Sequence, residues 1–198
     1  GMQIGQRVGG DMIKMINRQL FGNDSTQSLS KENFLAGFFA ALDDKALASI
    51  DSASTYVNTK AEEIRTKAIE AQYADYKKEN EAFLAENKSK EGVKTTASGL
   101  QYKVITEGKG EVPTAESRVK VNYKGTLIDG TEFDAREGMT FSAGHVIKGW
   151  TEALTMMPVG SKWELYVPQE LAYGSSATGK IKPFSTLIFE IELLEIEK

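Results

Sequence analysis

The chain of 198 residues has no cysteine and a single histidine, His145. The absence of cysteine excludes disulfides, thiol nucleophiles and cysteine-ligated metals, and a single histidine excludes a multi-histidine metal centre. A catalytic triad needs partners placed by geometry, so an ordinary loop position is favoured for His145 over a catalytic one. We therefore expect the protein to use neither a metal nor a cofactor.

The sequence also lacks a strong charge and a long apolar segment. Its formal net charge of −4 gives no basic footprint for nucleic acid. No run of 18 apolar residues is present, so no membrane span is expected. Gly1 before Met2 is typical of a residue left by expression tagging, and a signal peptide or lipid anchor would then be missing from this sequence. The composition is that of a globular protein of one or two domains.

Proline is absent from the first 90 residues, which have a helical pattern. Apolar residues recur at helical spacing from Ile4 to Leu20, and Gly22-Asn23-Asp24-Ser25 is a predicted break. Ser30 is a predicted N-cap, with Glu32 in the first turn of the helix that follows. That helix is expected to carry a broad apolar face made of Phe34, Leu35, Phe38, Phe39 and Leu42.

The apolar faces of these two short helices need partners, because isolated helices of this length are marginal in water. We expect them to bury against each other and against a second copy of the chain, in a helical dimerisation domain over residues 1–53. The alternative is that they fold back onto the C-terminal domain. A third helical run, about 54–87, has only a thin apolar stripe and solvated i, i+4 pairs such as Glu63 with Lys67. It predicts a long solvated helix, which with its polar junction forms a linking segment over residues 54–91.

The hydrophobic period changes from helical to alternating beyond the polar segment 88–97. Alternation predicts strands around residues 100–104, 119–123, 163–167 and 187–193. Asp129-Gly130 between two apolar runs predicts a hairpin, and residues 147–157 fit a short helix stopped by Pro158. The expected fold class is therefore α+β, with an all-helical N-terminal domain and linking helix followed by a domain of strands over residues 92–198.

Six short motifs follow one another in the last hundred residues: Val121-Asn122-Tyr123, Asp129-Gly130, Phe133-Asp134, Val146-Ile147-Lys148-Gly149-Trp150, Ala172-Tyr173-Gly174 and Leu187-Ile188-Phe189. Together they supply the aromatic, apolar and rim polar groups of a small ligand pocket. No nucleophile with its base is among them. The ordered set resembles the FKBP-type peptidyl-prolyl isomerases over about residues 95–196.

The resemblance implies an antiparallel sheet wrapped around a short helix, and catalysis of cis/trans rotation about X-Pro peptide bonds. It implies that Trp150 forms the floor under the proline ring. Asp134 would accept a hydrogen bond from Tyr123 and face the strained carbonyl. The Ile147 N–H and the Tyr173 hydroxyl would donate to the substrate. The implied walls of the pocket are Phe133, Val146, Ile147, Ile181 and Phe189.

Taken singly, each of Trp150, Phe133 and Phe189 is better explained as plain core than as part of a pocket. The joint presence of Asp134, Tyr123 and Tyr173 favours a pocket, since an aspartate directly after a buried aromatic is costly unless it is paired. Two segments depart from the family pattern. Residues 134–141 are expected to form a shortened loop, in which Arg136 is a candidate partner for Asp134. Ile181-Lys182-Pro183 stands where the family often has Ile-Pro-Pro, so that Lys182 puts a charge beside the pocket mouth.

The N-terminal part resembles the dimerisation domain of the macrophage infectivity potentiator group, chiefly through Phe34-Leu35-Ala36-Gly37-Phe38. The two likenesses imply a homodimer that assists the folding of unfolded or proline-containing proteins in the bacterial periplasm or cell envelope. A macrolide is a candidate ligand by the same resemblance. The alternative function is a dimeric chaperone-type binding module that holds unfolded chains with little turnover, and a passive structural dimer would need a blocked pocket.

Overall fold

The structure is a computed structural model that describes residues 8–21, 28–42 and 50–197. The chain divides into two compact units, Gly1–Ala71 and Gln72–Lys198. The described helices of the first unit are η1 (Val8–Met12), α2 (Ile13–Phe21), α3 (Lys31–Leu42) and α4 (Ile50–Gln72), whose last residue falls in the second unit. The functional division into residues 1–53, 54–91 and 92–198 stays a prediction.

Helix α3 of the first unit begins where the sequence predicts, with Ser30 as its N-cap. The Ser30 Oγ accepts the Asn33 N–H at 3.2 Å, and the Ser30 carbonyl accepts the Phe34 N–H at 2.9 Å. On α2, Ile13 is buried whereas Met15 is 62% exposed. The predicted start at Ile4, the predicted break at 22–25 and the side chains of Phe38, Phe39 and Leu42 lie outside the described residues. None of the helices described in either unit has both the length and the apolar character needed to cross a membrane.

The single solvated helix expected over 54–87 is corrected by the structure. Helix α4 ends at Gln72, and α5 (Ala74–Asn87) begins after Tyr73, which has a φ of −109° and a ψ of 17°. Helix α5 is packed into the second unit, because Asn80 and Asn87 are almost fully buried there. The sequence did not predict this packing, because a buried helix face is recognised by an apolar stripe and the buried residues of α5 are polar.

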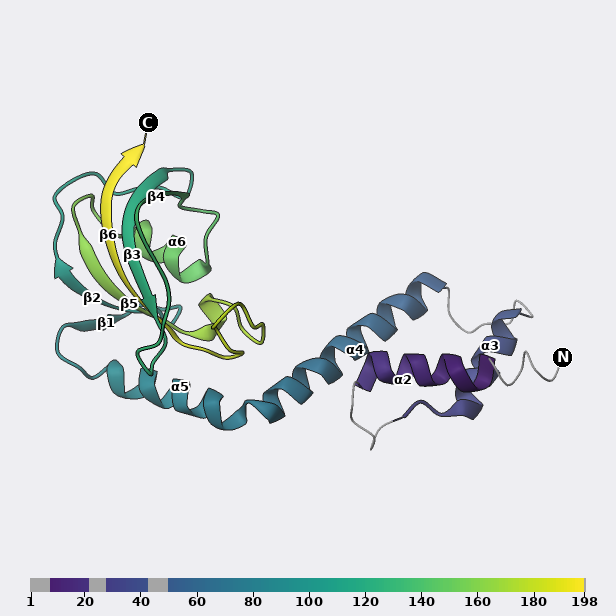
Figure 1. The fold of residues 1–198 in the computed structure, drawn as a ribbon. Helices are drawn as coiled ribbons and strands as arrows, with labels where there is room; N and C mark the ends of the chain where they lie inside the picture. The colour runs from purple at the N-terminus through teal and green to yellow at the C-terminus, as the bar shows by residue number, and fades with distance from the viewer. Residues whose placement is uncertain (1–7, 22–27, 43–49, 198) are drawn as a thin grey trace. The chain divides into compact units, whose positions relative to one another are not determined.

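The second unit is built on a six-stranded antiparallel sheet in the order β1-β2-β5-β6-β3-β4 (Figure 1). Its elements after α5 are β1 (Val93–Thr95), β2 (Gln101–Thr106), β3 (Arg118–Thr126), β4 (Glu132–Ser142), α6 (Lys148–Leu154), β5 (Lys162–Val167), η2 (Gln169–Leu171) and β6 (Leu187–Glu197). The predicted strands and the α+β class are confirmed. Strand β1 falls in the segment for which the sequence predicted only a polar junction.

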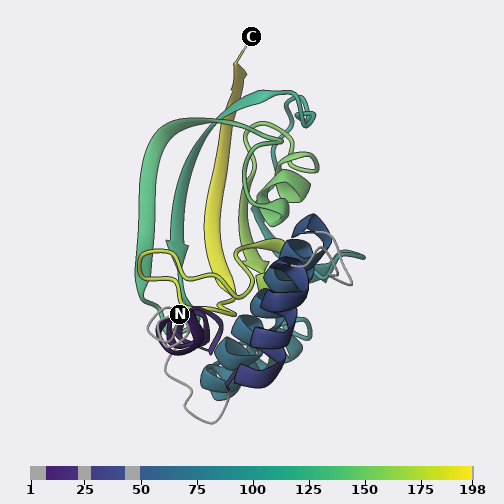
Figure 2. The ribbon, with the colours of Figure 1, turned by 90° about the vertical axis from the view of Figure 1, so that its right-hand side faces the viewer.

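The core lies between the sheet and α6, which is held against one face of the curved strands (Figures 1 and 2). Period-two alternation explains why one face of these strands contributes to the core. Val121 pairs with Leu193 and Tyr123 pairs with Ile191, and all four side chains face this core. Leu154 on α6 is fully buried against this face. The fold implied by the resemblance, a sheet wrapped around a short helix, is therefore confirmed.

The hairpin between β3 and β4 forms where Asp129-Gly130 predicts it. Gly130 has a φ of 83° and donates its N–H to the Leu127 carbonyl at 2.9 Å. Residues 134–141, expected as a loop, instead lie within β4. The reason is a β-bulge opposite Asn122: the pairing skips from Met139 to Arg136, and Gly138 takes a φ of 62°. Such a bulge breaks the simple alternation by which strands are predicted.

Candidate active site

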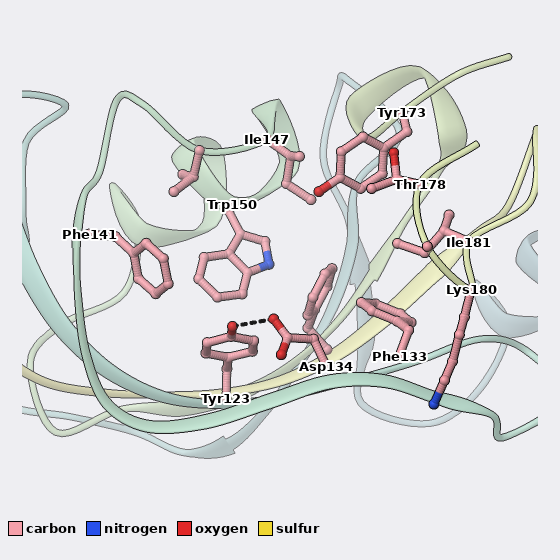
Figure 3. Close-up of a pocket in the computed structure, with 13 residues that line it drawn as sticks. Tyr123, Phe133, Asp134, Phe141, Ile147, Trp150, Tyr173, Thr178, Lys180 and Ile181 are labelled. Atoms are coloured by element: carbon pink, nitrogen blue, oxygen red, sulfur yellow. Dashed lines mark hydrogen bonds between the residues drawn. The ribbon is translucent and has the colours of Figure 1, made fainter. Parts of the chain in front are cut away.

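A cavity of about 370 Å³ opens on the α6 side of the sheet (Figure 3). All nine predicted site residues line it, namely Tyr123, Phe133, Asp134, Val146, Ile147, Trp150, Tyr173, Ile181 and Phe189. They come from strands β3, β4 and β6, from α6 and the turn before it, and from the long loop between η2 and β6. The cavity is also lined by four residues that the sequence did not predict for the site: Phe141, Thr178, Gly179 and Lys180. The roles of the nine residues in turnover stay predictions.

Trp150 lies at the centre of the cavity floor and is only 4% exposed. Three rings meet it edge-on: Tyr123 at 5.0 Å between ring centroids, Phe189 at 5.1 Å and Phe141 at 5.6 Å, with interplanar angles of 81–84°. Edge-to-face contacts of this kind fix ring orientation. Its buried indole Nε1 has no acceptor in the described part of the chain. The indole ring lines the cavity and contributes a flat surface to the floor.

One wall of the cavity depends on a glycine. The rings of Phe133 and Phe189 are 5.5 Å apart and almost perpendicular. They pack over Gly125 of β3, where an added Cβ would lie 2.6 Å from the Phe133 ring and 2.9 Å from the Phe189 ring. Both distances are shorter than side-chain atoms tolerate, so the two rings reach these positions only because residue 125 has no side chain.

The shortest hydrogen bond found among the described residues of the cavity joins Tyr123 and Asp134, on the adjacent strands β3 and β4. The Tyr123 hydroxyl donates to Asp134 Oδ2 at 2.5 Å (Figure 3). Burial, followed by this hydrogen bond, raises the pKa of Tyr123 to about 12. The phenol therefore keeps its proton to a higher pH than an ordinary tyrosine, and while protonated it donates to the carboxylate. Arg136 Nε lies 3.8 Å from the other oxygen, Asp134 Oδ1, which confirms Arg136 as a partner of Asp134.

Hydrogen-bond donors lie at the rim of the cavity. Ile147 occupies the N-cap position of α6 with a φ of −58° and a ψ of 148°, and no backbone carbonyl of residues 8–21, 28–42 or 50–197 accepts its N–H. Tyr173 is 39% exposed and its hydroxyl points into the cavity from the side opposite Asp134 (Figure 3).

The lysine at the cavity mouth is Lys180, whereas the sequence predicted Lys182. Lys180 lines the cavity and its Nζ donates to the Glu132 carbonyl at 2.9 Å. Lys182 does not line it, and its Nζ instead lies 5.2 Å from the centroid of the Tyr76 ring on α5. The sequence did not predict that Lys180 takes the place expected of Lys182, because an irregular loop has no periodicity from which the direction of a side chain can be predicted.

The chemistry available in this cavity is that of binding. It offers an aromatic floor, a carboxylate that accepts, and a hydroxyl and an amide that donate. Among the described residues, no group of three or more acidic or histidine side chains could hold a metal ion. Such a site suits a small apolar ring flanked by carbonyl groups.

Comparison with known proteins agrees with this geometry. A family model described as "FKBP-type peptidyl-prolyl cis-trans isomerase" matches residues 109–194, and one described as "Domain amino terminal to FKBP-type peptidyl-prolyl isomerase" matches residues 1–104. The chain is 42% identical to the "FKBP-type 22 kDa peptidyl-prolyl cis-trans isomerase" of Escherichia coli, over 99% of this chain and 91% of that protein. The chain belongs to the FKBP-type peptidyl-prolyl cis-trans isomerases. The resemblance found in the sequence is thereby confirmed.

Two further relatives extend the comparison for this FKBP-type isomerase. "Outer membrane protein MIP" of Legionella longbeachae is 47% identical, over 73% of this chain and 59% of that protein. The crystal structure of FkpA from Escherichia coli is 33% identical, with a TM-score of 0.63 over 98% of this chain and 95% of that one. The chain spans between 53% and 65% of the length of the curated FkpA and Mip relatives that it matches.

Proposed function

We propose that the cavity around Trp150 is where this FKBP-type isomerase rotates X-Pro peptide bonds, and that Asp134, Tyr123, Tyr173 and the Ile147 N–H act on the rotating bond. The barrier to rotation is about 18–20 kcal/mol, because resonance gives the C–N bond partial double-bond character. For X-Pro bonds both isomers are populated, yet they exchange slowly. The catalyst needs no nucleophile: it has to bind the twisted amide better than either planar isomer.

The apolar floor and walls supply part of this preference. Water stabilises the planar, charge-separated amide, so transfer of the prolyl ring onto Trp150 and between Phe133 and Phe189 favours the twisted form, in which the charge separation is lost. A million-fold acceleration needs about 8 kcal/mol of binding that is present only in the twisted state. The rigid aromatic packing around Trp150 supports this role, because a preformed cavity needs no reorganisation when the substrate enters.

The paired carboxylate supplies an electrostatic contribution. In our proposal Asp134 faces the carbonyl of the residue before proline, which loses its resonance partner as the bond twists. The 2.5 Å hydrogen bond from Tyr123 keeps the carboxylate in this orientation. The observation that carries the proposal is this pair, held directly beside the tryptophan floor, because a plain core would not place a carboxylate there.

The Ile147 N–H and the Tyr173 hydroxyl complete the site by donating to substrate carbonyl oxygens from the rim. Ile147 and Tyr173 both line the cavity, and no backbone carbonyl of the described residues accepts the Ile147 N–H. They fix the peptide on either side of the rotating bond, so that rotation is confined to that bond. Proximity and orientation of this kind lower a barrier without any covalent step.

Two substitutions test the roles of the polar groups. Asp134→Ala should lower kcat/KM by about 10- to 100-fold, the effect of losing a hydrogen-bonded charge, and Tyr173→Phe by about 5-fold, the effect of one neutral hydrogen bond. The measurement is a coupled isomerisation assay on a short X-Pro peptide, with folding checked by circular dichroism. Glu137→Ala is the matched control, because Glu137 is an exposed carboxylate on the same strand that does not line the cavity. Wild-type turnover in both folded site variants would refute the assignment.

We further infer that the protein is a homodimer joined through its N-terminal helices. The match of residues 1–104 to the domain that precedes FKBP-type isomerases and the exposure of Met15 on α2 support this arrangement. Light scattering should give twice the chain mass of 21.7 kDa. Replacement of Phe38 and Phe39 by polar residues should reduce it to a single chain mass. A wild-type mass of 21.7 kDa at micromolar concentration would instead favour helices that fold back as a monomer.

The proposed clients are unfolded or proline-containing proteins, and the proposed location is the bacterial periplasm or cell envelope. The relative named as an outer membrane protein supports this location, and fractionation of cells that make the native protein tests it. Family membership favours isomerase turnover over the alternative of a holding module with little turnover. Peptides without proline separate the two, since a holding module would bind them equally well. A macrolide stays a candidate ligand for the same cavity.

A further inference from the structure

The loop that precedes β6 contains a strained residue close to the cavity. Phe184 has a φ of 63° and is the one non-glycine residue with a positive φ in the described ranges. It is only 3% exposed. A bulky residue holds this left-handed conformation only where its surroundings fix it. We call Lys182–Thr186, the segment around Phe184, the buttress loop.

The surroundings that fix the buttress loop come from α5. Asn80 Oδ1 accepts the Thr186 N–H at 2.7 Å, in a position where both residues are buried. One turn earlier, the Tyr76 hydroxyl is 3.0 Å from Ser185 Oγ. The ammonium group of Lys77 also lies 5.1 Å from the centroid of the Phe184 ring. Three successive residues of the loop are thus held by one face of α5.

The buttress loop in turn holds two parts of the cavity. The Phe184 N–H donates to the Gly174 carbonyl at 2.8 Å, directly after Tyr173. At the other end, the loop follows Ile181, which exchanges two backbone hydrogen bonds of 2.9 Å with Thr178. Tyr173, Thr178 and Ile181 all line the cavity. A continuous chain of contacts therefore leads from α5 through Phe184 to the rim.

We propose that α5 positions the isomerase cavity, and that Asn80 and Tyr76 are positioning residues for Tyr173 and Ile181. Without α5 the buttress loop leaves the strained conformation for part of the time, and the rim leaves its binding geometry with it. The apparent affinity for substrate then falls in proportion to the fraction of molecules with an ordered rim. The groups that act on the twisted bond are unchanged once substrate has bound. The effect is therefore on KM and not on kcat, and for this readout the proposal rests on the proposed function.

The test uses the full chain and a matched pair of buried asparagines on α5. Asn80→Ala removes the acceptor for the buttress loop. Asn87→Ala removes a similarly buried side chain at the C-terminal end of α5, which donates to Gln101 Oε1 at 3.0 Å and has no hydrogen bond to the buttress loop among those found in the described residues. Tyr76→Phe is a milder variant that deletes one hydroxyl without opening a cavity. For each variant, KM and kcat are measured on an X-Pro peptide, and amide hydrogen exchange is measured at Phe184 and Ile181.

Asn80→Ala should raise KM about 5- to 10-fold and Tyr76→Phe about 2-fold, both with kcat near that of the wild type. Asn87→Ala should leave KM within about 2-fold of the wild-type value. It should lower the unfolding midpoint about as much as Asn80→Ala does. Exchange at Phe184 and Ile181 should become faster in the first two variants only. If Asn80→Ala does not fold, Tyr76→Phe decides through the exchange at Phe184 and Ile181, because its expected change in KM does not exceed the range allowed to the control.

Equal changes in KM for the two asparagine variants would overturn the proposal, because they would show general destabilisation. Unchanged exchange at Phe184 in Asn80→Ala and Tyr76→Phe would also overturn it, whatever the kinetics. A wild-type protein without isomerase turnover would defeat the proposed function, but the exchange measurement would still decide whether α5 orders the rim. The two failures are therefore distinguishable.

Discussion

Gly125→Ala should close part of the cavity from beneath. The glycine lies on β3, which is paired on both sides, with β4 and with β6. The backbone therefore cannot move away from a new methyl group. The methyl would lie 2.6 Å from two atoms of the Phe133 ring and 2.9 Å from the Phe189 ring. Ordinary contact begins near 3.4 Å, so both rings have to shift.

Both rings line the cavity, so a shift of either ring changes its shape. Phe189 already contacts Trp150 edge-on at 5.1 Å, so its displacement also disturbs the floor. Overpacking of this kind costs about 1–3 kcal/mol of stability. A displacement of about 1 Å at a site that works by orientation lowers turnover by up to about 100-fold. We expect kcat/KM to fall about 10- to 100-fold in a protein that remains folded, measured with an X-Pro peptide and with urea unfolding.

Gly110→Ala provides the matched control. Its Cβ would lie 2.7 Å from the Val159 Cβ, a clash of similar severity, but neither residue lines the cavity. It should lower stability by a comparable amount and leave kcat/KM within about 2-fold. Wild-type turnover in Gly125→Ala, or an equal loss in both variants, would show that the walls over Gly125 do not set the binding geometry.

Two other predictions concern the titration of the site and the extent of the isomerase unit. Since the pKa of Tyr123 is raised from 10.0 to about 12, its protonated form is stabilised by folding; the stabilisation is complete below pH 10 and is lost as the pH rises through about 12. Ultraviolet titration should therefore show late ionisation from Tyr123 and from Tyr166, whose pKa is also raised by burial. Tyr123→Phe should remove one of the two late transitions. Full tyrosine ionisation below pH 11 would contradict this prediction. A fragment of residues 72–198 should exceed a fragment of residues 92–198 in unfolding free energy by on the order of 2–4 kcal/mol, since hydrogen bonds from α5 are worth about 1 kcal/mol each. Equal stabilities in urea would show that α5 is not part of the folded unit.

The sheet could be predicted because its signals are local. Trp163 and Leu165 alternate with Lys162 and Glu164, and the hydrophobic effect places the apolar face inside. Asp129-Gly130 predicts the hairpin because only a residue without Cβ takes a φ of 83° easily. The start of α3 could be predicted in the same way, from the oxygen of Ser30. Each of these elements depends on residues that are close together in the chain.

The cavity could be predicted only in part from the residues themselves. Periodicity places Trp150 and Phe189 in a core and does not show whether that core has an opening. The resemblance to a known family supplied the remaining information, because it relates motifs that are distant in the sequence. Lys180 and Phe141 escaped prediction, the first in an irregular loop and the second beyond the bulge at Gly138.

The docking of α5 could not be predicted, for a physical reason. Its buried side chains are polar, and the sequence gives no sign that Asn80 meets Thr186 or that Asn87 meets Gln101. A helix with many charged residues and a thin apolar stripe is expected to be solvated. Hydrogen bonds between residues 106 positions apart have no local signature, and the strained Phe184 has none either.

The central claim is that X-Pro bonds rotate in the cavity above Trp150, and nuclear magnetic resonance can observe both the rotation and the place. The chain has two tryptophans, so the indole N–H of Trp163, which does not line the cavity, is an internal control for that of Trp150. With an X-Pro peptide in excess, exchange peaks between the cis and trans forms should appear at catalytic protein concentration, and the Trp150 signal should shift while the Trp163 signal stays in place. Absence of exchange peaks, or a shift confined to Trp163, would contradict the account.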